Sequence, residues 1–147
     1  MGARKETNME KQVYLEVTQE AGAAFFSKGI TGPVVMLNLL RFKDVADYSD
    51  FPDLAPPEPI SGREAYERYM THSAPHLDAA GSEVLFSGSA DRFLIGPQDE
   101  RWDSVLLVKH ASPLEFLAFA ENEPYLAGMG HRIGALEDSR LLPIIEG

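Results

Sequence analysis

The sequence predicts an α+β domain in which the core elements follow one another as strand, helix, strand, strand, helix, strand. Two observations predict this order: two Ser-x-x-Glu capping boxes begin helices, and apolar or alternating runs of strand length lie before, between and after them. The order is that of the ferredoxin-like βαββαβ unit, with a four-stranded antiparallel sheet. The chain has 147 residues, which suits one such domain and is short for two.

The helices are predicted from their capping residues. Ser61 and Glu64 form one capping box and Gly81 supplies a left-handed stop, which predicts a helix over 62–80. Further start signals are Thr18 before an extra N-terminal helix that ends at Gly29, Ser112 with Glu115 and Pro113 before the second core helix, and Asn122 before a short turn that ends at Gly128 or Gly130. Each capping side chain gives an otherwise unpaired backbone N–H group an acceptor.

The strands are predicted from runs between these helices, over 34–40, 82–95, 102–110 and 139–145, with a short additional strand over 12–17. Gly88 interrupts the second run and indicates a β-bulge there. Residues 1–11 are expected to form a flexible N-terminus, and residues 12–147 a single ferredoxin-like domain.

The first and third strands are apolar on both faces, although the two core helices can cover only one face of such a sheet. The faces of the first strand carry Val35, Leu37 and Leu39 on one side and Val34, Met36 and Leu40 on the other. The second apolar face needs a cover. A second copy of the chain, packed sheet to sheet, is the simplest one, which predicts a homodimer. The alternative is that the N-terminal segment and a Pro-rich loop cover this face within one chain.

Half of the net charge lies in one segment, residues 44–60. The whole chain has 13 Lys and Arg against 23 Asp and Glu, a formal charge of −10, and this segment holds five acids and no base. It also holds four of the ten prolines, which remove backbone donors and fix φ, so it is predicted to be an inserted loop. Tyr48, Phe51 and Leu54 are interleaved with the acids and predict that the loop lies against the body of the domain.

The composition excludes several classes of function. The excess of acids argues against nucleic-acid and anionic membrane partners, since both are bound through clustered Lys and Arg. The absence of cysteine excludes disulfides, thiolate metal sites and a cysteine nucleophile. The N-terminal residues contain no secretory signal, and no apolar run approaches the ~20 residues that cross a bilayer, so a cytoplasmic protein is expected.

Two polar residues on the first strand are candidates for substrate binding. Asn38 interrupts an apolar strand, and a buried amide needs a partner, which is either a substrate oxygen or the neighbouring backbone. Arg41 ends the same strand and can hold a carboxylate through two parallel hydrogen bonds, or form an ion pair with Asp44 or Glu64.

His131 is the strongest candidate for general acid or base catalysis, because its ordinary pKa of about 6.5 lies near working pH. It belongs to an irregular polar segment before the last strand, in which Arg132 is a candidate for substrate binding and is also expected to pair with Asp138. Tyr66 on the first core helix is expected to line a pocket. Trp102 is either a ligand contact or a packing anchor with one indole donor.

Neither a metal nor an organic cofactor is expected. His72 and His76 have the spacing of two ligands on one helix face, but Pro75 stands between them and no third ligand is obvious. The glycines at 128, 130 and 134 do not form a nucleotide-binding motif, because they follow a helix rather than a strand.

Four stretches together resemble the domain of unknown function 1330 family. They are MLNLLRF (36–42), GREAYERYM (62–70), WDSVLLVKH (102–110) with Ser112 and Pro113 after it, and HRIGALEDSRLLPI (131–144). The likeness runs from Gly32 to Ile144, and more loosely over 14–22. The family belongs to the dimeric α+β barrel superfamily, so the resemblance implies that fold and a dimer. The insertion at 44–60 departs from the minimal family pattern.

That family has no agreed activity, and the resemblance carries over no catalytic residue. Its superfamily neighbours include cofactor-independent monooxygenases, small-ring isomerases and haem-dependent enzymes, whose pockets lie between the inner face of the sheet and the helices or loops. The expected function is a small-molecule-binding homodimer and, more specifically, a cofactor-independent enzyme (monooxygenase- or isomerase-like) for a small aromatic or carboxylate metabolite. The alternative is a non-catalytic ligand-binding or assembly module, with its pocket filled by side chains.

Overall fold

The computed structural model describes residues 12–146 and confirms the predicted α+β order. The expected flexible N-terminus, residues 1–11, lies outside the described residues. The elements are α2 (Gln19–Phe26), β1 (Val34–Phe42), the 3₁₀ turn η1 (Pro52–Leu54), α3 (Gly62–Ala79), β2 (Glu83–Ser89), β3 (Ser104–His110), α4 (Pro113–Ala120), α5 (Glu123–Leu126), α6 (Met129–Ala135) and β4 (Leu136–Ile144). The extra N-terminal helix is α2, capped by Thr18 as predicted.

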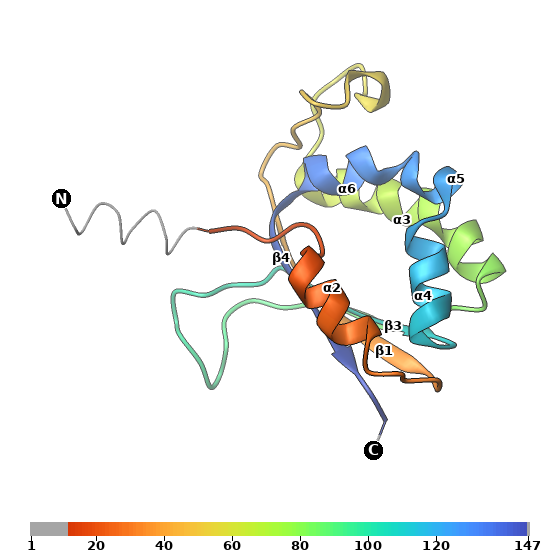
Figure 1. Ribbon diagram of the computed structural model, residues 1–147. Helices are drawn as coiled ribbons and strands as arrows, with labels where there is room; N and C mark the ends of the chain where they lie inside the picture. The colour runs from red at the N-terminus through yellow and green to blue at the C-terminus, as the bar shows by residue number, and fades with distance from the viewer. Residues whose placement is uncertain (1–11, 147) are drawn as a thin grey trace.

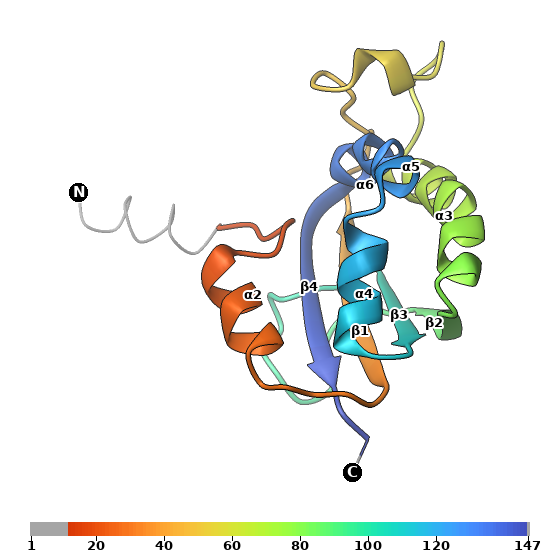
Figure 2. The same cartoon turned by 45° about the vertical axis from the view of Figure 1, so that its right-hand side comes forward.

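The four strands form one antiparallel sheet in the order β2-β3-β1-β4, which is the ferredoxin-like arrangement. Figure 2 shows this order, with α2 beside the β4 edge. The strand β1 is central, so that Leu37 lies between Leu107 of β3 and Leu142 of β4. The β-bulge of β2 lies between Val84 and Phe86, and the expectation of a bulge at Gly88 is therefore wrong.

Helices α3 to α6 lie together on one side of the sheet (Figure 1). These helices cover one face of the sheet, here called the inner face. The hydrophobic core lies between the helices and this face. Its larger members are Leu40, Phe42, Leu106 and Val108 of the sheet with Tyr66, Tyr69, Leu77, Phe119, Tyr125 and Leu136. The two capping boxes set where this layer begins: the Ser61 hydroxyl accepts from the Glu64 N–H at 3.0 Å, and Ser112 caps α4 in the same way.

The opposite, outer face of the sheet carries apolar side chains from every strand. They are Val35, Leu37 and Leu39 of β1, Val105 and Leu107 of β3, Phe86 of β2, and Leu142 and Ile144 of β4. Phe86 and Leu142 are 57% and 56% exposed. Of the N-terminal segment, the described residues from 12 onward contact the β4 edge and α6: the Tyr14 N–H donates to Asp138, and the Leu15 carbonyl accepts from Arg132. Neither these described residues nor the insertion covers Phe86 or Leu142.

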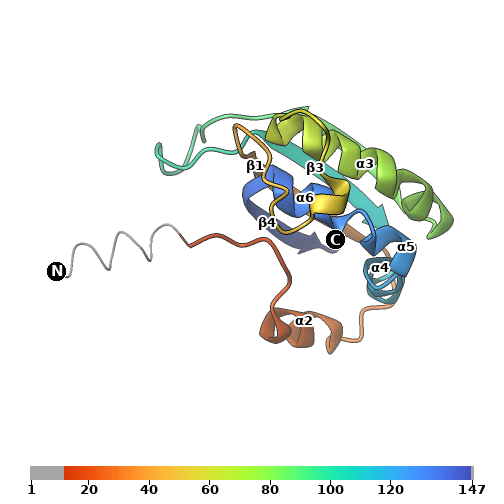
Figure 3. The same cartoon turned by 90° about the horizontal axis from the view of Figure 1, so that it is seen from above.

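The insertion at residues 44–60 is a loop with one 3₁₀ turn, as predicted, and it lies over α6 (Figure 3). The Asp47 N–H donates to the Gly134 carbonyl at 2.9 Å. A Cβ at Gly134 would lie 2.7 Å from the Asp47 carbonyl oxygen, and one at Gly130 would lie 2.6 Å from the Phe51 ring. These glycines therefore serve close packing, and the expected contact of the loop with the body is confirmed.

Three sequence expectations at element ends are wrong. Residues 12–17 form no strand, because this segment bonds to side chains instead of a ladder: the Ser139 hydroxyl donates to the Tyr14 carbonyl at 2.5 Å. The strand predicted over 82–95 ends at Ser89, and beyond it the chain makes only isolated pairings, such as the bridge between Arg92 and Arg101, as it leaves the sheet. Residues 129–135, expected to be irregular, form α6, and β4 begins at Leu136.

Among the described residues, 12–146, no helix combines the length and the apolar character that crossing a membrane requires.

The buried end of β3 holds a histidine. His110 is 2% exposed, lies against the rings of Phe116 and Phe119, and shares a hydrogen bond of 2.8 Å between its Nδ1 and the Ser82 hydroxyl. Burial lowers the pKa of His110 to about 4. The imidazole is therefore neutral in the folded protein at pH 7.

We expect His110 to make the protein less stable as the pH falls. Its folded pKa lies below the unfolded value of about 6.5, so the unfolded chain takes up the proton first and stability is lost from about pH 6.5 towards pH 4. The share of His110 is about 2 kcal/mol of unfolding free energy between pH 7 and pH 5. Urea denaturation at both pH values measures it. The double variant Ser82→Ala/His110→Phe should lose this share, and an unchanged pH dependence would contradict the assignment.

Candidate functional site

Two hollows flank the long helix α3. One, here called the groove, lies between α3 and α6 and has a volume of about 520 Å³. The other, here called the cleft, lies between α3 and the inner face of the sheet and has a volume of about 410 Å³. Glu67 and Thr71 line both hollows, so a single ridge of α3 separates them.

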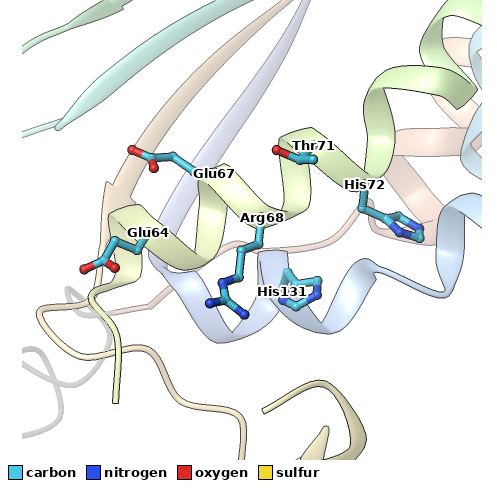
Figure 4. Close-up of a pocket in the computed structure, with 6 residues that line it drawn as sticks. All are labelled: Glu64, Glu67, Arg68, Thr71, His72 and His131. Atoms are coloured by element: carbon cyan, nitrogen blue, oxygen red, sulfur yellow. The ribbon is translucent and has the colours of Figure 1, made fainter. Parts of the chain in front are cut away.

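Most of the titratable side chains that line the two hollows are in the groove. Arg68 and His72 reach it from α3 and His131 from α6, and Figure 4 shows Arg68 and His131 side by side. Glu64 and Glu67 line the same hollow, so its two carboxylates outnumber its one permanent cation.

His131 is held by the insertion. Its Nδ1 lies 2.7 Å from the Tyr48 hydroxyl, and the two rings meet edge to face. Burial lowers the pKa of His131, and repulsion from Arg68 and then His72 lowers it further, so the imidazole is neutral at pH 7. Burial raises the pKa of Tyr48, which keeps the hydroxyl protonated. When that hydroxyl donates to Nδ1, Nε2 carries the proton; when Nδ1 donates, Nε2 is the acceptor that a general base needs.

The end of the groove nearest α5 is held by a hydrogen bond from a side chain to the backbone. His72 donates through Nε2 to the Pro124 carbonyl at 2.8 Å, which ties α3 to the start of α5. Pro75 lies inside α3 and has no N–H, so the Thr71 carbonyl has no helical donor four residues on.

The cleft has apolar walls and a charged rim. Leu40, Phe42, Met70 and Leu106 line it, together with the hydroxyl groups of Ser87 and Ser104. It stays open because α3 leaves β2 uncovered: Val84, which points to the inner face, is 44% exposed.

Arg63 and Glu67 stand at the solvent-exposed rim of the cleft. The Arg63 guanidinium lies 4.9 Å from the centre of the Phe42 ring, a cation–π distance. Tyr66, predicted to line a pocket, forms part of the cleft wall and is 6% exposed; burial strongly raises its pKa. Its hydroxyl is therefore a neutral hydrogen-bonding group at every physiological pH.

Other residues that the sequence singled out lie elsewhere. Arg41 and Trp102 are at one end of the outer face, where the Arg41 guanidinium lies 5.3 Å from the centre of the indole. Arg41 pairs with Asp138 at 3.4 Å and Glu137 at 3.8 Å, so the expected partners Asp44 and Glu64 are wrong. The sheet therefore separates Arg41 and Trp102 from both hollows, which lie on its helix side.

Arg132 and Asn38 make contacts within the fold. Arg132 donates to the Leu15 carbonyl at 2.5 Å and to the Ser139 hydroxyl at 3.4 Å. The expected ion pair with Asp138 is wrong, because that carboxylate is on the strand beyond α6 and binds Arg41 and Arg140 instead. The Asn38 amide donates to the Met36 and Leu106 carbonyls, both at 3.3 Å, which is its expected backbone pairing.

Within residues 12–146 no three side chains of the histidine, cysteine or carboxylate types gather as metal ligands do. The rings of His72 and His76 approach to 5.5 Å between centres, without a third such side chain beside them in this part of the chain.

Several residues that line the two hollows, or hold their side chains in place, were not identified from the sequence. Tyr48 lies 83 residues before His131, and only its place among the acids of the insertion marks it as a packing residue. Arg63 and Arg68 are separated from Tyr66 by three and two positions, so their two sides of α3 follow from helical spacing once the buried face is known. Ser87 and Ser104 are brought to the cleft by the β2–β3 register, which the sequence does not contain.

No family model and no curated protein matched the chain. Solved structures did. The methylated form of the RPA0582 protein has a TM-score of 0.79 and 34% identity, over 90% of this chain and 93% of that one. The RPA0582 protein of unknown function from Rhodopseudomonas palustris, a structural genomics target, has a TM-score of 0.78 and 34% identity over 90% and 96%.

The chain belongs to the family of the RPA0582 protein. The similarity covers nearly the whole of both chains, so this family shares the ferredoxin-like sheet with its extra helix. Because the RPA0582 protein is itself described as of unknown function, membership of its family gives a fold and no activity.

The Arg68→Gln variant should raise the pKa of His131 towards its ordinary value, because it removes the nearest positive charge. An NMR titration of the imidazole signals against pH measures this. Arg63→Gln is the matched control, since Arg63 faces the cleft on the other side of α3 and should leave the His131 pKa unchanged. Equal shifts in both variants would contradict the placement of Arg68 beside His131.

Proposed function

We propose that the protein is a homodimer that binds a small molecule with an aromatic or other apolar body and a carboxylate. One observation carries the ligand class: the cleft combines apolar walls with the Arg63 guanidinium at its rim. Pockets for small molecules are mostly apolar with a few polar groups that fix orientation. An apolar body fills the space between Leu40, Met70 and Leu106, while the carboxylate accepts from Arg63.

Charge favours the cleft over the groove for an anionic ligand. The groove is lined by Glu64 and Glu67 and adjoins the acidic insertion through Tyr48, so it repels a carboxylate. At the cleft the single carboxylate of Glu67 is balanced by Arg63. Ser87 adds a hydroxyl group that can bind a phenol or a carbonyl of the ligand, and the Ser104 hydroxyl, which donates to the Gly88 carbonyl at 3.2 Å, can accept from a phenol.

A second and separate candidate function is a cofactor-independent enzyme with His131 as acid or base, whose substrate would bind in the groove instead of the cleft. Its support is the neutral imidazole held by Tyr48 in the larger hollow, one ridge of α3 away from the cleft. The alternative, a non-catalytic binding or assembly module, predicts that a ligand is taken up and released unchanged. Membership of the domain of unknown function 1330 family and a cytoplasmic location belong to the same proposal; the four sequence stretches and the lack of a secretory signal support them.

The homodimer is proposed from the outer face. Phe86 and Leu142 are more than half exposed on a face whose centre is apolar, and burial of such side chains contributes about 1.5–3 kcal/mol each. A sheet-to-sheet contact between two copies covers this face on both chains at once, as an isologous interface does.

The Arg63→Gln variant should bind aromatic carboxylates about tenfold more weakly, because a charge-assisted hydrogen bond is lost. Benzoate, salicylate and phenylacetate are suitable probes, measured by thermal shift and then by calorimetry. The corresponding neutral amides should bind both proteins equally weakly.

Arg68→Gln is the matched control and should bind the carboxylates as the unaltered chain does. Carboxylate binding that Arg63→Gln leaves unchanged, or that Arg68→Gln or His131→Ala abolishes, would place the ligand in the groove and contradict the assignment to the cleft.

The Leu142→Asp variant should be monomeric, because in the dimer each new carboxylate would be buried without a partner against the apolar outer face of the other chain. Light scattering after size exclusion gives the mass. Leu114→Asp is the control: Leu114 is 70% exposed on α4, in the helix layer, and its replacement should leave the dimer intact. A monomeric mass for the unaltered chain would contradict the dimer itself.

A further inference from the structure

Residues 90–103, which connect β2 to β3, form an arm that projects from the sheet. Figures 1 and 2 show it on the side of the sheet opposite to helices α3–α6, which is the side of the outer face. Its root is paired: the Ala90 N–H donates to the Asp103 carbonyl at 3.1 Å, and the Trp102 N–H to the Asp91 carbonyl at 3.0 Å.

The root of the arm is anchored on the outer face by Trp102. This side chain is 2% exposed, and the guanidinium groups of Arg41 and Arg140 lie 5.3 Å and 5.0 Å from its ring centre. The Arg41 guanidinium also donates to the Arg101 carbonyl at 3.3 Å. The direction of the arm is therefore set by side chains of β1 and β4.

The tip of the arm is apolar and has no contact that buries it. Leu94 is 99% exposed and Ile95 is 93% exposed, the highest values of any large apolar side chain in the described residues. The turn that presents them is held by its own polar groups: Gln98 donates to the Phe93 carbonyl at 2.8 Å, and Arg92 donates to the Gln98 carbonyl. An ordered turn that exposes two aliphatic side chains to water does not stabilise a single chain.

The outer face can accept such a tip from another copy. The chain as a whole carries −10, but the charges on the face itself balance, with Arg41, Lys109 and Arg140 against Glu83, Glu137 and Asp138, and the arm adds four acids against two bases, a net −2. Five of the excess acids lie in the insertion, against α6 on the other side of the sheet. Two copies can therefore bring these faces together without the repulsion that the net charge implies.

We propose that the arm grips a second copy of the chain, with Leu94 and Ile95 of each protomer buried against the outer face of its partner. This inference rests on the proposed homodimer and adds to it: the apolar tip and the apolar face are two halves of one self-complementary contact, made twice across the two-fold axis. The tip cannot fill this role in its own chain, since it stands clear of its own sheet at 99% and 93% exposure.

The Leu94→Ser/Ile95→Ser double variant tests the inference without disturbing the monomer, because both side chains are almost fully exposed. The dissociation constant of the dimer, from sedimentation equilibrium over a dilution series, should rise at least tenfold. Leu114→Ser, an exposed leucine on α4, should leave it unchanged. If the unaltered chain is dimeric, Leu142→Asp is monomeric and the arm variant dimerises as tightly as the unaltered chain, the arm proposal is overturned and the homodimer stands. A monomeric unaltered chain overturns both.

The absence of cysteine allows a direct test of position. A Leu94→Cys variant carries one thiol, which is labelled with benzophenone maleimide and irradiated in a mixture of isotope-labelled and unlabelled chains. Mass spectrometry should find the arm of one chain joined to β2 or β4 of another. Cross-links confined to a single chain, or to the helix layer of the partner, overturn the proposal.

Discussion

The structure depends on a central strand, β1, that is apolar on both faces. Val34, Met36 and Leu40 need the helix layer, and Leu37 and Leu39 need a second cover. One layer of helices covers one face of a four-stranded sheet, so the capping boxes, the turn into α4 and the packing of α6 all serve the inner side. What the chain leaves exposed then follows from the same constraint: the apolar residues of the outer face, and the arm that stands beside them.

The buried carboxylate of Asp138 connects the parts that this division separates. It is 3% exposed and accepts from the Tyr14 and Ser139 N–H groups at 2.8 and 2.9 Å, while Arg140 and Arg41 lie at 2.8 and 3.4 Å. A buried charge is tolerated only when it is paired in this way. Because the same two arginines contact the Trp102 ring, Asp138 connects the N-terminal segment from Tyr14 on, the β1–β4 pairing and the root of the arm.

The sequence was most informative where the signal is local. Capping boxes, the glycine stop at Gly81 and the prolines of the insertion are read within a few residues, and the elements that they delimit are confirmed. Pairings across the chain were not accessible. Asp138 has Arg132 and Arg140 near it along the sequence, and only the β1–β4 register, which pairs Arg41 with Asp138, brings the distant Arg41 to this carboxylate. The helix α6 was hidden because its glycines suggest a loop, whereas they are small in order to admit the insertion.

The net charge of −10 is distributed unevenly, so the groove and the outer face differ in their electrostatic character. Glu64 and Glu67 of α3 line the groove at His131, and in the proposed function they disfavour anions there and leave the rim of the cleft, with Arg63, as the place for a carboxylate. On the outer face each base has an acid close to it, as in the Arg41–Glu137 and Arg140–Asp138 pairs. Pairing removes the long-range field of this face while the insertion keeps the molecule acidic. Under the functions proposed above, the position of the acids, more than their number, separates the surface for a small ligand from the surface suited to another copy of the chain.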